Sequence, residues 1–163
     1  MSTTTILTML SSDHREVAKL FNELEKTTEK SGKKRTELFM RLDKALSAHA
    51  EFEEERVYPL LEEKKSAQAT ALEAVEEHIQ IKRLLGELRD LDPQDAHWTA
   101  KMTVLMENVR HHVKEEEGEA FPKLKKAASS SELVELGEEY QTLKSDAAAP
   151  TGKNVRTPTP VEV

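Results

Sequence analysis

Hydrophobic residues recur along most of this sequence at alternating steps of three and four, the spacing that places them on one face of an α-helix. Four long helices are predicted from this pattern, at residues 6–29, 35–63, 67–91 and 96–126. The connections between them are short and include Ser31-Gly32 and the segment DPQD at 92–95. Because short connections make neighbouring helices antiparallel, we expect an all-α protein, an up-down-up-down antiparallel four-helix bundle.

The C-terminal part of the chain shows two different patterns. Residues 132–144 are amphipathic, which predicts a short helix packed across the bundle. Its apolar face contains Leu133, Leu136, Tyr140 and Leu143. The segment 145–163 is rich in Pro, Thr and Ala with few large apolar side chains, a composition typical of disordered tails. The sequence thus predicts one domain over residues 1–144 and a disordered tail from Ser145.

Polar side chains interrupt the apolar stripes of all four long helices. Six of them stand at positions that the helical period assigns to the core: His14, His49, Glu53, His78, His112 and Glu116. An ionised glutamate without a partner is costly in a protein core, or it takes up a proton there. Two metal ions would compensate these carboxylates, and imidazole with carboxylate is a ligand set that suits transition metals. We therefore interpret the six residues as metal ligands.

An internal repeat supports this interpretation. His49 and Glu53 are four residues apart, so both lie on one helix face, and the pair recurs 63 residues later as His112 and Glu116. In both copies an aromatic residue and a proline follow at the same offsets, and the other two histidines of the set are 64 residues apart. A single such pair is more often exposed, and a lone buried histidine is more often a hydrogen-bonded core residue. Duplication on buried stripes favours coordination instead.

Neighbouring residues offer other choices of ligand. His111 and Glu115 have the same four-residue spacing, but His112 continues the buried stripe. We therefore expect His111 to be exposed or to contact the site from outside, and we keep Glu117 as an alternative ligand. His97 is expected to be a surface or capping residue.

The composition restricts the class of protein. Of 163 residues, 37% are hydrophobic, 34% are charged and 5 are Gly, a balance that favours helices. The absence of cysteine excludes disulfides, thiolate zinc sites, cysteine-ligated clusters and a cysteine nucleophile. A net charge of -7 with dispersed basic residues predicts no nucleic-acid partner, and no segment reaches the roughly 20 apolar residues of a membrane span. We expect a soluble cytoplasmic protein, and its oligomeric state stays open.

The six residues, in their order along the chain, resemble the hemerythrin HHE cation-binding domains in their H-HxxxE-H-HxxxE form, over about residues 5 to 126. The resemblance implies a four-helix bundle around a non-haem di-iron centre with an oxo or hydroxo bridge. It also implies how the ligands are shared: His14 and His49 on one iron, His78 and His112 on the other, with Glu53 and Glu116 bridging.

Two positions depart from the pattern of the oxygen-carrying hemerythrins. Those proteins have a fifth histidine where this sequence has Lys82, and a protonated lysine cannot coordinate a metal. Their second bridging carboxylate lies five residues after its histidine, whereas Glu116 lies four residues after His112. Water or another protein group is expected to fill the room left by the fifth histidine, with Tyr58 and neighbouring acids as candidates. Reversible oxygen carriage is therefore not expected.

The resemblance and the missing histidine together predict a small di-iron protein that binds and reacts with O2, hydrogen peroxide or nitric oxide. The enzyme class would be a catalase-like or peroxidase-like oxidoreductase, or one that removes nitric oxide. One alternative is an iron- or oxygen-sensing module, in which the helix at 132–144 is the candidate transducer, and a second is iron storage. Zinc or manganese would also accept these ligands, and zinc would imply a structural role.

Overall fold

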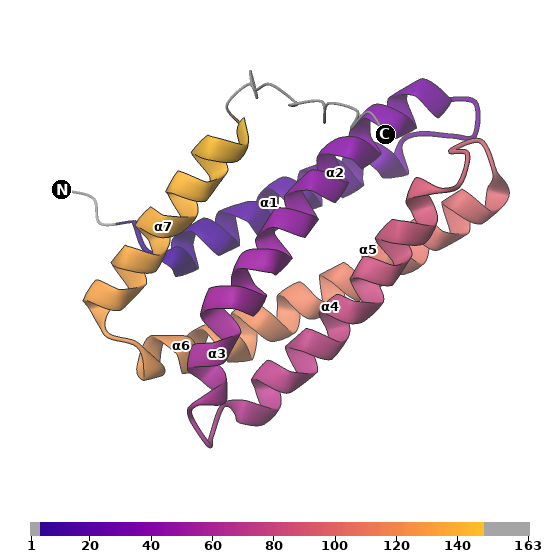
Figure 1. The fold of residues 1–163 in the computed structure, drawn as a ribbon. Helices are drawn as coiled ribbons and strands as arrows, with labels where there is room; N and C mark the ends of the chain where they lie inside the picture. The colour runs from indigo at the N-terminus through magenta and orange to yellow at the C-terminus, as the bar shows by residue number, and fades with distance from the viewer. Residues whose placement is uncertain (1–3, 149–163) are drawn as a thin grey trace, which may run out of the picture.

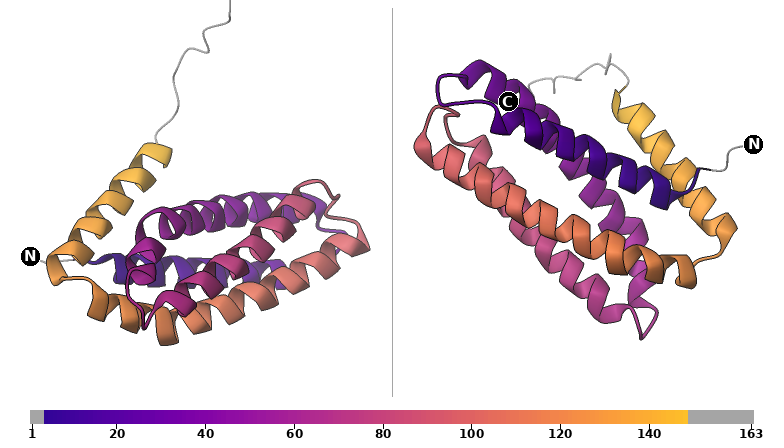
Figure 2. Two further views of the ribbon diagram at one scale, coloured as in Figure 1. Left: turned by 60° about the horizontal axis from the view of Figure 1, so that its bottom comes forward. Right: turned by 180° about the vertical axis from the view of Figure 1, so that it is seen from behind.

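The computed structural model describes residues 4–148 (Figure 1). The long helices of the bundle are α1 (Ile6–Glu25), α2 (Gly32–Phe52), α4 (Gln68–Arg89) and α5 (Ala96–Glu115). They run alternately up and down, as the views in Figures 1 and 2 agree. The predicted all-α, antiparallel four-helix bundle is confirmed.

The first helix ends earlier than the hydrophobic period predicts. It stops at Glu25 rather than at residue 29, because Thr27 turns its hydroxyl back onto the Leu24 carbonyl at 2.6 Å. The side chain of Arg35, at the start of α2, donates to the same hydroxyl at 2.9 Å. These bonds close the connection between the first two helices.

Two long helices contain a π-helical turn at matching positions. α2 is followed by η1 (Glu53–Val57) and α3 (Tyr58–Glu62), and α5 is followed by η2 (Glu116–Ala120) and α6 (Phe121–Ala127). In each turn a backbone N–H bonds to the carbonyl five residues earlier, from Tyr58 to Glu53 and from Phe121 to Glu116. Each turn is followed by a proline, which cannot supply the next N–H. Such turns occur frequently at functional sites.

The π-helical turn corrects the predicted buried stripe of the second helix. The α-helical period places Leu60 in the core, but Leu60 is only partly buried and Leu61 is fully buried. The extra residue in the turn η1 shifts the following side chains around the axis by one position. The same turn brings Tyr58 into the interior.

Two hydrophobic clusters fill the bundle, one toward each end. The cluster near the loops that join α1 to α2 and α4 to α5 includes Phe21, Leu42, Leu85 and Trp98. The other lies around α3 and α6 and includes Leu10, Phe52, Leu61 and Leu124. Along each long helix the change from one cluster to the other occurs at the buried histidine. The polar residues therefore form a layer between two apolar cores.

The C-terminal helix, α7 (Ser130–Ala148), packs against α1 outside the four-helix bundle (Figures 1 and 2). It is longer than the predicted 132–144 at both ends, and it includes residues 145–148, which the sequence assigned to the tail. The rest of that tail, 149–163, lies outside the described residues. Leu143, predicted on the apolar face, is 51% exposed.

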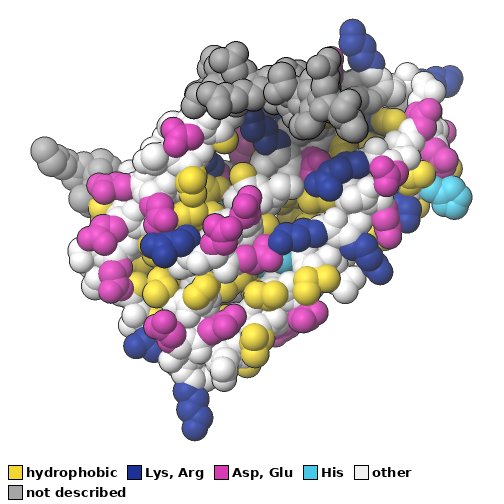
Figure 3. Space-filling model, viewed as in Figure 1, with side chains coloured by type: hydrophobic (Ala, Val, Ile, Leu, Met, Phe, Trp, Pro, Cys, Tyr) yellow, Lys and Arg dark blue, Asp and Glu magenta, His cyan; other side chains and the backbone are white. Residues whose placement is uncertain are grey.

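The surface carries mixed charges. In Figure 3, acidic and basic side chains are interspersed over the visible face, with small apolar areas between them. Within residues 4–148, no helix has the length and apolar character needed to cross a membrane. The cytoplasmic location stays a prediction.

Candidate metal centre

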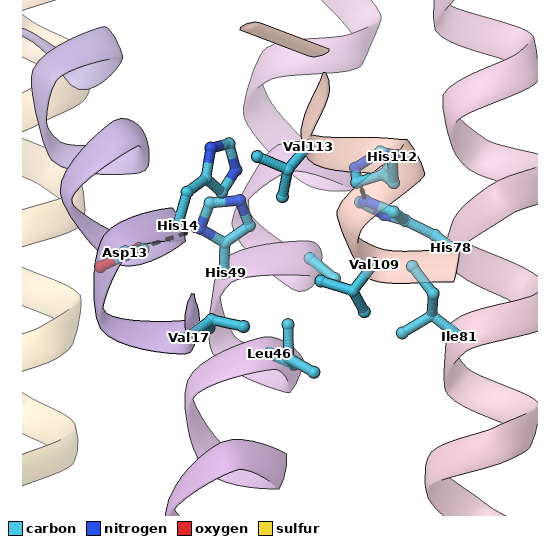
Figure 4. A pocket seen from close by; sticks show the side chains of 11 residues that line it. Asp13, His14, Val17, Leu46, His49, His78, Ile81, Val109, His112 and Val113 are labelled. Carbon is cyan, nitrogen blue, oxygen red and sulfur yellow. Dashed lines mark hydrogen bonds and ion pairs between the residues drawn. The ribbon is translucent and has the colours of Figure 1, made fainter. Parts of the chain in front are cut away.

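The six predicted ligands meet inside the bundle. Each is less than a tenth exposed. Each of the four long helices contributes one histidine, and each π-helical turn contributes one glutamate. The set is His14 on α1, His49 on α2, Glu53 in η1, His78 on α4, His112 on α5 and Glu116 in η2. Figure 4 shows the four imidazoles facing one another across the bundle.

Both carboxylates lie between histidines of different helix pairs. Glu53 Oε1 is 2.9 Å from Nε2 of His49 and 3.5 Å from Nε2 of His78. Glu116 places Oε1 3.1 Å from Nε2 of His14 and Oε2 3.3 Å from Nε2 of His112. Glu116 Oε1 also lies 3.8 Å from Nε2 of His49. Each carboxylate therefore contacts histidines of both the α1–α2 pair and the α4–α5 pair, which is the placement required of a carboxylate that bridges two metals.

Several atoms at the centre of this cluster have no hydrogen-bond partner within the described chain. They are Nε2 of His14, Nε2 of His49, both carboxylate oxygens of Glu53, and Oε1 of Glu116. Buried polar groups are nearly always satisfied, so a group of orphaned atoms at one point indicates a ligand that accepts their lone pairs. The donor set fits a metal ion, and two groups of ligand atoms each lie within 4.8 Å of one another.

In each of the four histidines, the ring nitrogen that faces away from the centre, Nδ1, contacts a carboxylate. The Nδ1 distances are 2.9 Å from His14 to Glu117, 2.9 Å from His49 to Asp13, 3.3 Å from His78 to Glu54 and 3.0 Å from His112 to Glu77. A carboxylate at Nδ1 favours the tautomer with its proton there, which leaves Nε2 free to coordinate. The arrangement is typical of histidines that bind metals.

These carboxylates follow the internal repeat. Asp13 and Glu77 precede the histidines of α1 and α4 in sequence, and each bonds to the histidine of the next helix in its own pair. Glu54 and Glu117 follow the central glutamates, and each bonds to a histidine of the opposite pair. Two of the bonds therefore act within a helix pair, and two connect the pairs.

Tyr58 lies at one side of the centre. Its hydroxyl donates to Glu116 Oε2 at 2.5 Å and lies 3.1 Å from Nε2 of His78 and 3.4 Å from Nε2 of His112. The repeat places Phe121 at the equivalent position, where its ring stacks on His14 at 5.8 Å. The two halves of the centre therefore differ: one has a hydroxyl and the other has an apolar ring.

Lys82, at the position of the absent fifth histidine, points away from the centre. Its side chain is 48% exposed, and Nζ contacts Glu54 at 2.6 Å. On the inside, the hydroxyl of Tyr58 lies within 3.4 Å of Nε2 of both His78 and His112. Of the groups that the sequence suggested for this room, the structure places Tyr58 there.

The remaining sequence alternatives take other positions. Glu117, the alternative ligand, is 44% exposed and contacts His14 at Nδ1, away from the two central glutamates. His111 has a 61% exposed side chain and contacts Glu77 at 3.3 Å. His97 is exposed, and Asp95 caps α5 by accepting its backbone N–H at 2.8 Å.

Charge compensation changes the pKa values of the cluster. Burial lowers the pKa of His49, but the charge of Glu53 and hydrogen bonds to neighbouring carboxylates raise it well above its ordinary value. Burial also lowers the pKa of His112, yet bonds to Glu116 and Glu77 raise it to about 10. Burial raises the pKa of Glu116, but the surrounding histidines hold it well below its usual range. Protons thus balance the carboxylates, and a metal would displace them.

A small cavity borders the histidines on their apolar side (Figure 4). Its volume is about 30 Å³, and its apolar wall is formed by Val17, Leu46, Ile81, Val109 and Val113. A water molecule needs about 10–15 Å³ by this kind of measure, so the space suits molecules of two or three non-hydrogen atoms. A larger substrate would not fit beside the histidines.

Sequence reasoning predicted the six central residues but not the role of the four carboxylates that contact Nδ1, of which it named only Glu117, as an alternative ligand. Each of the four is adjacent in sequence to one of the six: Asp13, Glu54, Glu77 and Glu117. An adjacent residue lies about 100° around the helix, so the period assigns it to the solvent side. The available signal was the repeat itself, which carries an acid before His14 and His78 and a second acid after Glu53 and Glu116.

Comparison with known proteins agrees with this geometry. The chain matches the hemerythrin HHE cation binding domain over residues 5–124. Its fold is similar to the crystal structure of a hemerythrin HHE cation binding domain-containing protein from Mycobacterium kansasii, with a TM-score of 0.75 and 22% identity, covering 88% of this chain and 86% of that one. It is also 30% identical over 133 residues to a protein from Nostoc sp. (strain PCC 7120) named DNA nickase. That alignment covers 82% of this chain and 37% of the relative's length.

The fold and the cluster define the class first: an antiparallel helical bundle with a buried histidine–glutamate cluster that could bind metal. The match over residues 5–124 then gives the family. This chain belongs to the hemerythrin HHE cation-binding domain family.

Proposed function

We propose that the protein holds two iron ions in this cluster and binds and reacts with O2, hydrogen peroxide or nitric oxide there. The observation that carries the proposal is the position of Glu53 and Glu116, each between histidines of opposite helix pairs. Two such ions, when bound, can change between ferrous and ferric states and so exchange two electrons with a small molecule.

The histidines group in the way that two metal positions require. The rings of His14 and His49 lie 4.9 Å apart, and those of His78 and His112 lie 4.6 Å apart. This grouping supports one pair of histidines for each iron, with Glu53 and Glu116 shared between the two. Zinc and manganese accept the same ligands, so iron is the part of the proposal that needs direct measurement.

The cavity supports a small molecule as the reactant. The cavity of about 30 Å³ lies directly beside the histidines and Asp13, and the rest of its lining is apolar. Val109 and Val113 of α5 face Val17 and Leu46 across this space (Figure 4). O2, nitric oxide and hydrogen peroxide match the size, and the apolar wall excludes larger charged substrates.

Tyr58 supports reaction rather than reversible binding. Burial and the charges of Glu53 and Glu116 raise the pKa of its hydroxyl, so the group keeps its proton. It can donate a hydrogen bond or a proton beside His78 and His112. Reduction of peroxide to water consumes protons, and a catalase-like reaction needs no separate reductant, because a second peroxide is oxidised to O2.

The test is anaerobic loading with ferrous iron, followed by elemental analysis and optical spectra before and after hydrogen peroxide, O2 or nitric oxide. We expect two irons per chain, a change of the near-ultraviolet to visible spectrum with O2, and consumption of peroxide or nitric oxide. Failure to bind iron, or bound iron that leaves all three molecules and the spectrum unchanged, would overturn the proposal.

A sensing role is a second candidate, since one carboxylate behind the site is shared with α7. Asp13 accepts hydrogen bonds from His49 at 2.9 Å and from Tyr140 at 2.5 Å. A change at the centre therefore has a direct contact through which to reach the outer helix.

A further inference from the structure

Asp13 receives donors from both the bundle and the outer helix. Its Oδ2 accepts from Nδ1 of His49 at 2.9 Å and from the hydroxyl of Tyr140 at 2.5 Å. Its Oδ1 accepts from Nζ of Lys144. The Asp13 side chain is only 15% exposed, so these three partners replace most of its hydration. One buried carboxylate thereby joins α7 to a histidine of the candidate metal centre.

The rest of the α7 interface fixes the position of these donors. Tyr140 is 2% exposed, and its ring lies 4.7 Å from the ring of Phe52, the residue before Glu53. At Gly137 an added Cβ would come within 3.1 Å of backbone atoms of residues 4–6. The backbones of α7 and of the start of α1 therefore approach closely, and a larger residue at Gly137 would force the two helices apart. The tyrosine hydroxyl is thus aimed at Asp13 by packing on both sides.

The repeat shows that this contact is an addition to the symmetric site. Glu77 is the counterpart of Asp13, and its outer contact is His111, from α5 of the bundle. Glu54, behind His78, is held by Lys82, also from the bundle. The histidine on α2 thus depends on a carboxylate that α7 holds, whereas those on α4 and α5 depend on contacts made within the bundle.

We propose that α7 is a metal-linked element, and that Tyr140 and Lys144 are positioning residues for His49 acting through Asp13. The inference rests on the proposed metal centre and adds that docking of α7 and metal binding at His49 favour each other. Docked α7 holds the Asp13 carboxylate in line with His49, which presents Nε2 to the metal. Undocking removes two of the three donors and lets the carboxylate turn toward water. By thermodynamic reciprocity, a metal that prefers the ordered His49 stabilises the docked helix.

The variants for the test are Tyr140→Phe, Lys144→Met and their double combination. Tyr140→Phe keeps the ring that packs on Phe52 and removes only the hydroxyl. The matched control is Arg56→Met, because Arg56 makes a 3.0 Å ion pair with Glu139 of α7 that does not involve Asp13. A general loosening of α7 would affect the control as well.

The first measurement is an anaerobic calorimetric titration with ferrous iron. Loss of a group behind a metal-binding histidine costs about 10–100-fold in affinity. Since the donors act one residue further out, we expect about tenfold weaker binding in one of the two steps for the double variant, and no change for Arg56→Met. The NMR signal of His49 Nδ1–H should shift in Tyr140→Phe, which a purely structural role of α7 would not cause.

The second measurement is hydrogen exchange of α7 amides in the wild type and in the double variant, each with and without iron. Iron should slow exchange over residues 133–144 in the wild type and have less effect in the double variant. Equal α7 exchange with and without iron overturns the inference, as do unchanged binding steps in the double variant or an equal loss in Arg56→Met. Should the double variant not fold, Tyr140→Phe alone decides.

The two proposals fail in different ways. A wild type that binds two irons but is inert toward O2, peroxide and nitric oxide overturns the proposed reaction and leaves the coupling to be decided by exchange. A wild type that reacts but shows no change in α7 overturns the coupling alone. A wild type that binds no iron overturns both.

Discussion

Glu53 is the side chain on which the candidate centre depends most. It is fully buried, neither of its carboxylate oxygens has a hydrogen-bond partner within residues 4–148, and it contacts His49 and His78 at Nε2. A buried carboxylate in this state is unfavourable unless a cation or proton compensates it. Glu53 therefore destabilises the fold unless a cation compensates its charge, and a bound metal ion would do so.

We predict that Glu53→Ala loses metal and the stability that metal confers. A ligand present at about 1,000 times its Kd adds about 4 kcal/mol to the free energy of unfolding. The variant should lose most of this gain, as measured by thermal unfolding with and without iron alongside elemental analysis. Glu51→Ala, an exposed acid on the same helix, serves as the control. Unchanged iron content in the Glu53 variant would contradict the bridging role.

Tyr58 offers a separate test of reactivity. In Tyr58→Phe the ring remains, but the proton beside Glu116 is removed. We expect two irons per chain as in the wild type and peroxide consumption reduced at least about tenfold, since general acid groups contribute about 10²–10⁴-fold. The rate is to be compared at equal iron content, and an equal rate would show that the hydroxyl takes no part.

At the residue scale, the sequence predicted the side chains that point inward and missed those that hold them. His49 and His112 lie on buried stripes, so periodicity identifies them. Asp13 and Glu77 reach their histidines only because a second helix stands alongside, and a pattern along one helix contains no information about that neighbour. Tyr58 was a candidate, but its inward position needs the π-helical turn.

At the scale of elements, the molecule consists of two similar helix pairs, and a carboxylate of each pair bonds to a histidine of the other pair. Glu54 of the first pair bonds to His78 of the second, and Glu117 of the second bonds to His14 of the first. The centre is thus assembled across the interface of the pairs, and correct docking of the pairs orients the ligands of both.

These hydrogen bonds between the pairs predict that the double variant Glu54→Gln/Glu117→Gln binds iron more weakly. An amide accepts a weaker hydrogen bond from imidazole than a carboxylate does, so iron affinity should fall about 10–100-fold. Calorimetric titration provides the measurement. The control is Glu55→Gln/Glu115→Gln, which changes two exposed acids of the same segments. Similar affinities for the two double variants would contradict a role for the cross-pair bonds.

The helices themselves were largely predictable from the sequence, apart from three local features. The first helix ends at Glu25 because a threonine side chain closes the turn, a bond that the hydrophobic period does not encode. The π-helical turns shift Leu61 into the core in place of Leu60. α7 extends through Ala148, where a composition poor in large apolar residues favoured disorder.

At the scale of the whole molecule, the polar layer separates two apolar cores. Phe21 and Trp98 belong to one core, and Phe52 and Leu124 to the other. The residues of both cores are apolar side chains that are no part of the candidate ligand set. The charges of the layer must still balance, and the raised pKa values of His49 and His112 indicate that protons on these two histidines provide that balance without metal.

The proton balance predicts how stability depends on pH. The pKa of His112 rises from 6.5 to about 10 on folding, so its contribution is complete below pH 6.5 and is lost as pH rises through about 10. The free energy of unfolding of metal-free protein should fall by about 2 kcal/mol or more between pH 7 and 9.5, since each pKa unit corresponds to about 1.4 kcal/mol.

Denaturant unfolding across this pH range checks the prediction. In iron-loaded protein the free energy of unfolding should depend less on pH, because the metal replaces the protons at Nε2. Loading with iron in weak buffer should release protons. Metal-free stability that rises from pH 7 to 9.5, or loading without proton release, would contradict the assignment of charges in the layer.

In the proposed centre, four histidines and two glutamates hold two metals between them. An anomalous difference map at the iron absorption edge, from crystals of protein loaded anaerobically with ferrous iron, tests it most directly. We predict two peaks, one next to His14 and His49 and one next to His78 and His112, with Glu53 and Glu116 between them. A single peak, no peak, or iron bound by other side chains would show that these six residues do not hold two metals.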